Sequence, residues 1–455
     1  MRVLFVLLAS AGLAAAGVAS ASAQVPEALA GRWSGAAVTD GVPRLFDLEL
    51  AVQGDSLAAV LTQPYDGFAR FPYPFAYEPG RADGELVAGL FGDEMRLIVD
   101  LGDATVRGTV VSDGDTTATV FLQRVLDVPL PVVRAEPVAL PVGADTLEGR
   151  WLRPAGAGPF PAVVLVAGRG GSAADLLPWG ERLARVGVAA LALSPRGAGG
   201  STGDAATTTD RDRFAELGAA LDWAAARPDV HADRLGVLSY SAGAWVVPPV
   251  VVDRSDVAFW VSLVGPAESL TDQQGHVTTA FMRASGEAFT EAEYAEAFAY
   301  QAGLVTLAQR GAPWSAFEAG NAAARAARWA EHALIPDSLD QEDLSYYRRR
   351  AGFDARAALA RLRVPTLAVF GGADPIVPPE PNAELWRTLA REAGNDALTV
   401  VVLDGADHGL GRPGGAVGEG PWPAGYTRSW SRPAALFETV LAWVRERAGV
   451  AQSSP

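Results

Sequence analysis

The second half of the sequence holds a serine in a setting typical of nucleophilic catalysis. Ser241 lies in Leu235–Gly243, where a short apolar run leads into Ser-x-Ser-x-Gly and then a helical pattern. A serine flanked by small residues at a strand-to-helix turn forms a nucleophile elbow, which exposes the hydroxyl and points the next N–H at a developing oxyanion. That N–H belongs to Ala242, and Ser239 replaces the first glycine of the usual G-x-S-x-G. A plain Ser/Gly turn before a helix is the alternative interpretation.

The base that such a serine needs must be one of four histidines. His408 follows the apolar run Leu398–Leu403 and precedes the last helical segment, where a strand-to-helix loop would carry it. His231 precedes the elbow strand and is expected at the opposite end of that strand. His276 and His332 belong to a helix-rich stretch and are expected on its surface. We therefore predict His408 as the general base.

Asp374 is predicted to orient the imidazole. It closes an apolar run ending in Gly-Gly-Ala-Asp, and the chain order Ser, Asp, His is that of α/β-hydrolase triads. Asp404 and Asp407 are alternatives closer to His408 in sequence. A carboxylate in the same short loop seldom reaches the far ring nitrogen, so we favour Asp374.

The second oxyanion donor is expected from the turn after the first core strand. That turn is Gly168-Arg169-Gly170-Gly171, whose glycines would let the backbone approach a substrate. We predict the N–H of Arg169, with Gly170 as the next choice. The Arg169 side chain could either meet an acidic substrate or face solvent.

The composition excludes several other chemistries. The 455 residues include no Cys, and all 37 basic residues are Arg, so cysteine nucleophiles, disulfides, Schiff bases and Ser–Lys pairs are absent. The formal net charge of −16 argues against nucleic acid or an anionic membrane as a partner. We expect no cofactor and no metal.

The elements that would position these residues follow a strand–helix alternation. Apolar runs and helical patterns alternate from about residue 161 to 264 and from 365 to 447, which predicts a mostly parallel sheet covered on both faces. Residues 266–352 interrupt it with several predicted helices, either a cap over the site or a purely structural elaboration. The short alternating runs of residues 24–126 predict a small all-β accessory domain, a sandwich or a barrel. A Pro- and Val-rich linker is expected over 127–141, so the catalytic domain would span 127–450.

The first residues are typical of a cleavable signal peptide. Arg2 is followed by an apolar stretch, and Ala21-Ser22-Ala23 forms an A-x-A cleavage site. Residues 1–23 are therefore predicted to be removed, giving a periplasmic or secreted protein; an uncleaved anchor helix is the alternative. No later apolar run reaches about 18 residues, so no stable membrane insertion is expected.

From about residue 134 to 448 the chain resembles α/β-hydrolases. The resemblance is to the bacterial group of dienelactone-hydrolase-like esterases and prolyl-oligopeptidase-type catalytic domains. Val166–Gly171 resembles the oxyanion turn of that group without its usual His, and Gly371–Pro378 resembles its acid loop. Ser194–Gly203 resembles its D-x-R-G-x-G-x-S loop, with Ser194 replacing the Asp. The resemblance implies an α/β-hydrolase fold with a helical cap insertion and a small N-terminal β domain.

The reaction expected from these residues is acyl transfer to water. Ser241 would attack the carbonyl of a carboxylic ester of small or medium size, with His408 as base and the N–H groups of Ala242 and Arg169 holding the oxyanion. A peptidase, amidase or thioesterase with the same triad is an alternative. A non-catalytic envelope binding protein on a hydrolase scaffold is another. The sequence does not set the oligomeric state.

Overall fold

The chain forms two compact units, which are described separately. The computed structural model describes residues 24–39, 42–54, 56–63, 68–80, 82–90, 93–125, 131–352, 354–411 and 434–450. Residues 24–125 make up the β unit, and residues 131–411 with 434–450 make up the α/β unit. The predicted signal peptide, residues 1–23, lies outside the described residues. Within the described ranges, no helix combines the length and the apolar character needed to cross a membrane.

The β unit is one antiparallel sheet of nine strands in the order β4-β3-β2-β1-β9-β8-β7-β6-β5. Trp33 of β1, Leu48 of β2 and Leu97 of β7 are fully buried in one core. Because strands so far apart in the order share a core, the sheet must curve strongly. The described strands therefore form a single curved sheet instead of two packed ones. They are β1 (Gly31–Thr39), β2 (Val42–Gln53), β3 (Ser56–Gln63), β4 (Phe68–Tyr73), β5 (Ala76–Glu78), β6 (Glu85–Leu90), β7 (Asp93–Asp100), β8 (Thr105–Ser112) and β9 (Asp115–Val125), after a 3-10 turn η1 (Glu27–Leu29).

The α/β unit is built on an eight-stranded sheet in the order β10-β11-β13-β12-β14-β15-β16-β17. The strands from β13 to β17 run parallel, whereas β10 and β11 pair antiparallel. All strand residues of β13 and β16 are buried, as expected for parallel strands covered on both faces. The strands are β10 (Val133–Val142), β11 (Asp145–Pro154), β12 (Phe160–Val166), β13 (Ala189–Leu193), β14 (Val230–Tyr240), β15 (Val257–Leu263), β16 (Thr366–Gly371) and β17 (Leu398–Leu403).

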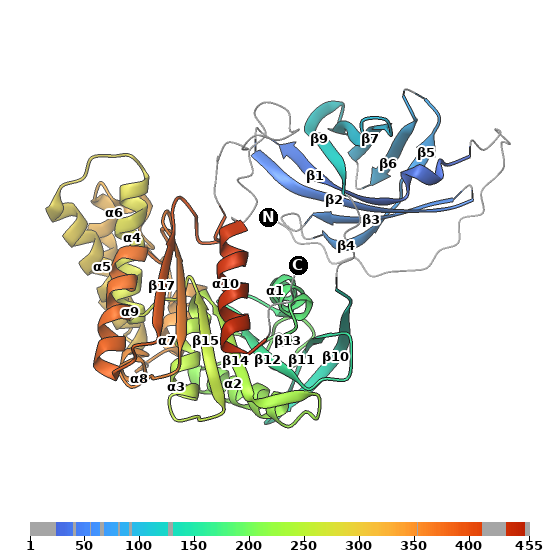
Figure 1. Ribbon diagram of the computed structural model, residues 1–455. Helices are drawn as coiled ribbons and strands as arrows, with labels where there is room; N and C mark the ends of the chain where they lie inside the picture. Colours follow the sequence, from blue (N-terminus) through green and yellow to red (C-terminus); the bar gives the residue numbers. More distant parts are fainter. Residues whose placement is uncertain are drawn as a thin grey trace. The chain divides into compact units, whose positions relative to one another are not determined.

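Helices cover both faces of this sheet (Figure 1). Apolar residues of α1 and α10 pack in the core on one face, and those of α2, α3 and α9 pack in the core on the other. This layering confirms the predicted α/β-hydrolase architecture. The helices are α1 (Ala173–Arg185), α2 (Asp210–Ala225), α3 (Val247–Val251), α8 (Arg356–Leu359), α9 (Pro379–Ala393) and α10 (Ala434–Arg447), with a 3-10 turn η3 (Ser241–Trp245) before α3.

The prediction of a linker over residues 127–141 is wrong for most of that range. Val133–Val142 is strand β10, which pairs with β11. Pro137 and Pro141 suggested a linker, but β10 is the edge strand of the sheet, where a residue without an N–H is tolerated. Proline content therefore misled the prediction at this edge.

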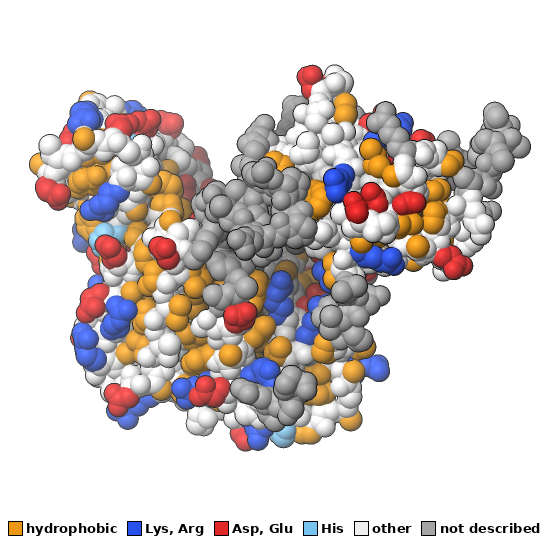
Figure 2. All heavy atoms as spheres, turned by 45° about the horizontal axis from the view of Figure 1, so that its top comes forward, with side chains coloured by type: hydrophobic (Ala, Val, Ile, Leu, Met, Phe, Trp, Pro, Cys, Tyr) orange, Lys and Arg blue, Asp and Glu red, His pale blue; other side chains and the backbone are white. Residues whose placement is uncertain are grey.

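Residues 266–352 form a group of helices inserted between β15 and β16. Their outer side holds a small core of its own around Met282 and Trp329, whereas Leu304, Phe317 and Tyr347 join the main core. The insertion is thus an integral layer of the unit. Figure 2 shows acidic and basic side chains interspersed over the visible face of the α/β unit. The helices are α4 (Leu270–Ala284), α5 (Glu291–Gln309), α6 (Ser315–Ala326), a 3-10 turn η4 (Ala330–His332) and α7 (Glu342–Arg349).

Candidate active site

Ser241 lies at the sharp turn between β14 and η3. Its backbone φ is +49°, a conformation that residues with a side chain seldom adopt and that is characteristic of a strained functional turn. The turn is close to the end of β12, because a Cβ on Gly243 would lie 2.9 Å from the carbonyl oxygen of Val166. A glycine two residues after the serine is therefore required by packing. This geometry is that of a nucleophile elbow.

Ser239 occupies the position where the motif usually has glycine. Its side chain is fully buried, and its Oγ accepts a hydrogen bond from Nε1 of Trp260 at 2.9 Å. Trp260 belongs to the neighbouring strand β15, which pairs with β14. The hydroxyl of Ser239 is thus satisfied inside the sheet, and this explains how the motif tolerates the extra side chain.

The structure brings Ser241, His408 and Asp374 together in a hydrogen-bonded chain. Nε2 of His408 lies 3.0 Å from Oγ of Ser241, and Nδ1 lies 2.8 Å from Oδ2 of Asp374. The Asp374 side chain is completely buried, and its other oxygen accepts the backbone N–H groups of Ile376 and Val377 at 2.8 and 3.0 Å. A carboxylate held by two N–H groups presents a fixed oxygen to the imidazole. The arrangement can transfer a proton from serine to histidine.

The two competing aspartates are occupied elsewhere or exposed. Asp407 accepts the N–H of Gly411 at 2.9 Å and so closes its own turn, and Asp404 is exposed. Gly371 lets this turn approach, because a Cβ there would lie 2.4 Å from the carbonyl oxygen of Asp407. The loop that carries His408 is therefore packed tightly against the end of β16.

Tyr240, which sequence reasoning overlooked, connects the nucleophile turn to the histidine loop. Its hydroxyl donates a hydrogen bond to the carbonyl oxygen of His408 at 2.6 Å, and the two rings meet edge to face. The only available signal was the position of Tyr240 directly before Ser241. Since its partner lies 168 residues away, the sequence could not show the bond.

The predicted oxyanion turn passes directly beside the serine. A Cβ on Gly168 would lie 3.1 Å from Cβ of Ser241 and 3.7 Å from its Oγ, so a side chain here would force the turn away from the serine by a few tenths of an ångström. Gly170 has a φ of +71°, and the N–H of Gly171 closes the turn on the carbonyl of Gly168. The N–H of Ala242 belongs to the first turn of η3, where helical N–H groups lack intrahelical partners.

The Arg169 side chain reaches the helical insertion and meets acidic groups there. It donates to Glu342 at 2.5 Å and to Asp343 at 2.7 Å, both in the first turn of α7, and lies 4.1 Å from the ring of Tyr346. Burial alone would lower the pKa of Arg169, but the hydrogen bond and charge of Asp343, with Tyr346 and Glu342, raise it above its ordinary value. The oxyanion turn and α7 are thereby joined.

A pocket of about 340 Å³ opens beside the oxyanion turn. Its wall includes residues 167–171, Ala242, the start of α2 and one side of α7. Helix α7 therefore forms part of the wall of this pocket. Neither Ser241 nor His408 is among the described wall residues. The volume is at the small end of those typical of ligand sites.

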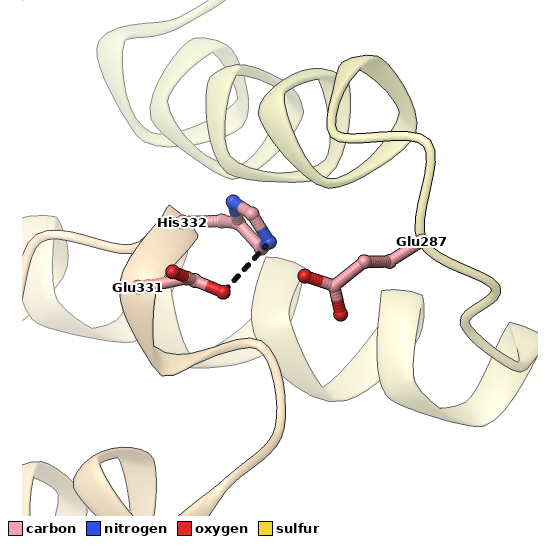
Figure 3. Close-up of side chains that lie close together, drawn as sticks. All are labelled: Glu287, Glu331 and His332. Atoms are coloured by element: carbon pink, nitrogen blue, oxygen red, sulfur yellow. Dashed lines mark ion pairs between the residues drawn. The ribbon is translucent and has the colours of Figure 1, made fainter.

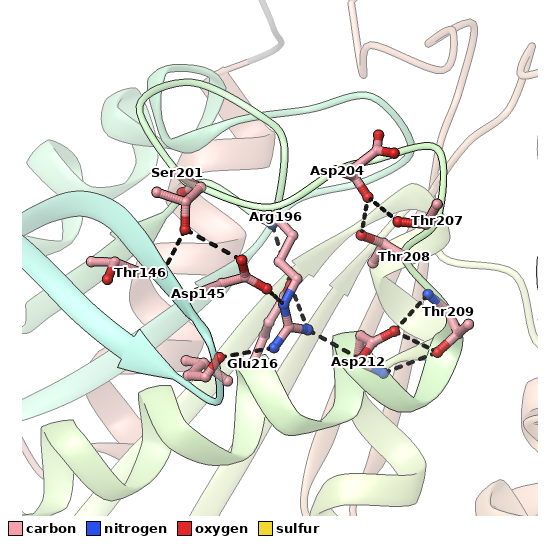
Figure 4. Close-up of polar contacts among 12 residues, drawn as sticks. Asp145, Thr146, Arg196, Ser201, Asp204, Thr207, Thr208, Thr209, Asp212 and Glu216 are labelled. Atoms are coloured by element: carbon pink, nitrogen blue, oxygen red, sulfur yellow. Dashed lines mark hydrogen bonds and ion pairs between the residues drawn. The ribbon is translucent and has the colours of Figure 1, made fainter.

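The loop that resembles D-x-R-G-x-G-x-S contributes to the wall of this pocket and is held by polar contacts (Figure 4). Arg196, only 10% exposed in its side chain, pairs with Asp145 at 2.7 Å and with Glu216 at 3.3 Å. Ser194, in place of the usual Asp, accepts the first N–H of α1 at 3.0 Å. The loop is thus held from three sides by β11, α1 and α2.

The remaining histidines lie away from the triad. His231 is the second residue of β14, at the opposite end of the strand from Ser241, as predicted. His276 of α4 lies with Nδ1 2.6 Å from the buried Glu268, so it is not simply a surface residue. His332 stands near Glu287 and Glu331, and one atom of each could approach a metal ion (Figure 3). Both of these glutamates are exposed.

A buried polar network behind the acid loop was not predicted. Asn382 accepts the N–H of Ala267 at 2.8 Å and donates to Glu268 at 3.1 Å. Gln273 of α4 donates to the carbonyl oxygen of Ile376, two residues after Asp374. The first helix of the insertion thereby contacts the loop that holds the triad carboxylate. Its polar residues are typical of any helix, so the sequence contained no signal for it.

Comparison with known families gives a match over most of the α/β unit. Residues 157–412 match the family described as serine aminopeptidase, S33, which is more than half of the chain. Comparison with curated protein sequences gave no match.

Solved structures with similar folds include several hydrolases. An esterase from Pyrococcus furiosus is 16% identical, with a TM-score of 0.44 over 69% of this chain and 91% of its own. An esterase from Pyrobaculum calidifontis is 18% identical, with a TM-score of 0.43 over 69% and 86%. The 2,6-dihydroxy-pseudo-oxynicotine hydrolase is 15% identical, with a TM-score of 0.43 over 70% of each chain. Similarity at this level carries no argument about substrate.

Proposed function

Since the chain belongs to the hydrolase family described as serine aminopeptidase S33, we propose that it is a serine hydrolase that cleaves carboxylic esters. The observation that carries this proposal is the chain of two hydrogen bonds from Ser241 through His408 to the buried Asp374. The strained φ of Ser241 supports it, because a nucleophile elbow requires such a sharp turn between strand and helix.

The proposed reaction proceeds through an acyl-enzyme. His408 accepts the hydroxyl proton of Ser241 while Oγ forms a bond to the acyl carbon, and the N–H groups of Ala242 and Arg169 stabilise the oxyanion. The C–O bond to the alcohol then breaks, and His408 returns the proton to the departing alcohol. Water, deprotonated by His408, attacks the acyl carbon and releases the acid.

The experiment is labelling with a fluorophosphonate probe, in wild type and Ser241→Ala, followed by mass-spectrometric location of the adduct. Ser285→Ala, an exposed serine of the insertion, is the matched control. We expect labelling of wild type and of the control, and none of Ser241→Ala. Failure of the folded wild type to react would contradict the proposal and favour the alternative of a binding protein.

A peptidase is the second candidate, because the family description names an aminopeptidase. The same triad would act on an amide, whose leaving group requires a stronger general acid. Parallel rates on a p-nitrophenyl ester and an aminoacyl p-nitroanilide separate the two. We expect the ester to be cleaved faster by at least about 100-fold, and a preference for the anilide would reverse the assignment.

Export remains a further proposal. The leader pattern of residues 1–23 supports removal after Ala23. Mass determination of the protein recovered from a periplasmic fraction tests it, and a mass that retains the leader would contradict it.

A further inference from the structure

The pocket beside the oxyanion turn contains a carboxylate that is not fully hydrogen-bonded. Asp210, the first residue of α2, is 8% exposed in its side chain and lines the pocket. Its Oδ1 accepts a hydrogen bond from Nη1 of Arg350 at 2.6 Å. Its Oδ2 is buried and receives no hydrogen bond from a described residue. A buried acceptor without a donor is costly, so this oxygen points to a missing donor.

Two arginines in the same wall retain hydrogen-bond donors. Arg350 uses one N–H in its bond to Asp210, and no other hydrogen bond from its guanidinium to a described residue is found. Arg213 donates to Glu216 at 2.7 Å and to the carbonyl of Ala167 at 3.4 Å. A guanidinium has five N–H groups, so both side chains have donors to spare.

The wall is held in place by packing. The guanidinium of Arg350 lies 4.5 Å from the ring of Tyr346, and that of Arg169 lies 4.1 Å from the same ring. The Tyr346 ring is thus flanked by two cations, an arrangement that stabilises both. Burial raises the pKa of Asp210, although Arg350 and Arg213 oppose the shift. The charged groups of the wall are therefore fixed and partly dehydrated.

The chemistry of this wall discriminates among ligand groups. A carboxylate would gain from the arginines but would be repelled by Asp210, and an ammonium would gain from Asp210 but would be repelled by Arg213 and Arg350. A hydroxyl both donates and accepts, so it can donate to Oδ2 of Asp210 and accept from a guanidinium at once. It adds no charge to a set of groups that already pair with one another.

The position of the pocket indicates which part of a substrate enters it. The leaving oxygen of an ester must lie within reach of Nε2 of His408. His408 is not among the described residues that line the pocket. The wall instead includes the oxyanion turn and Ala242. The acyl group is therefore the part that extends into the pocket, and the volume suits a short chain.

We propose, resting on the serine hydrolase function above, that this pocket selects short acyl groups bearing a hydroxyl, which bridges Asp210 and Arg350. The substrate class is then an ester of a short hydroxy acid. Discrimination by such a site is strong, because an analogue without the hydroxyl leaves buried polar groups unpaired.

Five p-nitrophenyl esters of matched length test the proposal. They are the butyryl, 3-hydroxybutyryl (both enantiomers), 3-aminobutyryl and monosuccinyl esters, each measured as kcat/KM with wild type and Ser241→Ala. We expect one 3-hydroxybutyryl enantiomer to exceed the butyryl ester by about tenfold or more. Equal rates for these two, or a preference for the amino or succinyl ester, would overturn the inference while leaving the hydrolase function intact. No Ser241-dependent cleavage of any ester would overturn both.

The variant Asp210→Asn tests whether the preference for a hydroxyl-bearing acyl group arises at this wall of the pocket. An amide keeps one acceptor but replaces Oδ2 with a donor, so the ratio of hydroxybutyryl to butyryl kcat/KM should fall by about fivefold or more. Because the ratio comes from one preparation, partial unfolding does not alter it. Asp229→Asn is the matched control and should keep the ratio. Asp229 is paired with Arg227 and lies directly before β14, whose other end carries Ser241. A ratio unchanged in Asp210→Asn would contradict the proposed location.

Discussion

The two units of the chain differ in what they bury. Among the described residues of the β unit, only two polar side chains are buried, those of Asp47 and Thr105, and the core is otherwise apolar. The α/β unit buries many more, and several of them border the triad or the pocket. Buried polar groups are stabilising only when they are satisfied, so a concentration of them marks where structure has been adapted to chemistry. Those of the α/β unit are Ser194, Asp210, Glu216, Ser239, Ser262, Glu268, Gln273, Thr278, Thr279, Gln301, Asn321, Thr366, Asp374 and Asn382.

Backbone strain follows the same division. In the β unit the non-glycine residues with positive φ, Ala82, Ala104 and Asp113, lie in turns between strands. In the α/β unit they are Ser241, Val264 and Leu410, at the carboxyl ends of β14 and β15 and in the histidine loop. Strain in the first unit reverses the chain direction, whereas in the second it includes the turn that exposes Ser241 beside His408. Paired variants, one from each unit, test this contrast.

The largest difference in kcat is expected between variants of two buried aspartates, one from each unit. Asp374→Asn should lower kcat by about 10⁴-fold, because the amide no longer holds the imidazole in the required tautomer. Asp47→Asn removes a carboxylate paired with Arg32 at 3.0 Å and should lower the free energy of unfolding by about 1 kcal/mol with kcat unchanged. Ester hydrolysis and urea unfolding measure the two effects. A similar loss of kcat in both variants would remove the distinction between the units.

A smaller difference in kcat is expected between variants of two tightly packed glycines, one from each unit. In Gly168→Ala the new Cβ would lie 3.0 Å from the carbonyl oxygen of Tyr240, so the oxyanion turn must shift and kcat should fall roughly 10- to 100-fold. In Gly35→Ala the Cβ would lie 2.0 Å from the carbonyl oxygen of Phe121, and the melting temperature should fall instead. Rates are expressed per active site titrated with the fluorophosphonate. If Gly35→Ala lowers that rate, the β unit influences the chemistry.

The smallest difference concerns two tyrosines that each donate to a backbone carbonyl. Tyr240→Phe frees the histidine loop and should lower kcat about tenfold with little change in KM, since the loss affects the position of the base and not substrate binding. Tyr77→Phe removes the bond to Asp83 at 2.9 Å in the β unit and should leave both constants unchanged. The separation of a lowered kcat from an unchanged KM is the second readout, because a general loss of folded protein would not distinguish the two constants. An unaltered kcat in Tyr240→Phe would exclude a positioning role.

The triad could be predicted because each of its members follows an apolar strand in the chain order of this fold. Ser241 and His408 each follow an apolar run and are closely followed by a glycine, Gly243 or Gly409, and this local pattern can be seen in the sequence alone. Asp374 was chosen over Asp407 on a geometric argument, and the structure places its carboxylate 2.8 Å from the ring. Local patterns therefore sufficed where the chemistry depends on strand ends.

Contacts between distant segments could not be predicted. The partners of Arg169 lie more than 170 residues away on α7, so its side chain was left between two alternatives. The hydroxyl of Ser239 is satisfied by Trp260 from another strand, which the motif alone could not reveal. Strand β10 was mistaken for a linker, because the tolerance of an edge strand for proline depends on its place in the sheet.

The positive φ of Ser241 has an evolutionary consequence. Glycine adopts this conformation without the penalty of roughly 1–3 kcal/mol that a side chain incurs, so a population selected for stability alone would fix glycine at position 241. A protein that keeps serine at position 241 therefore lacks the stability that glycine would provide there. The residue therefore reports which property selection has favoured, and a descendant freed from its reaction should lose the hydroxyl early.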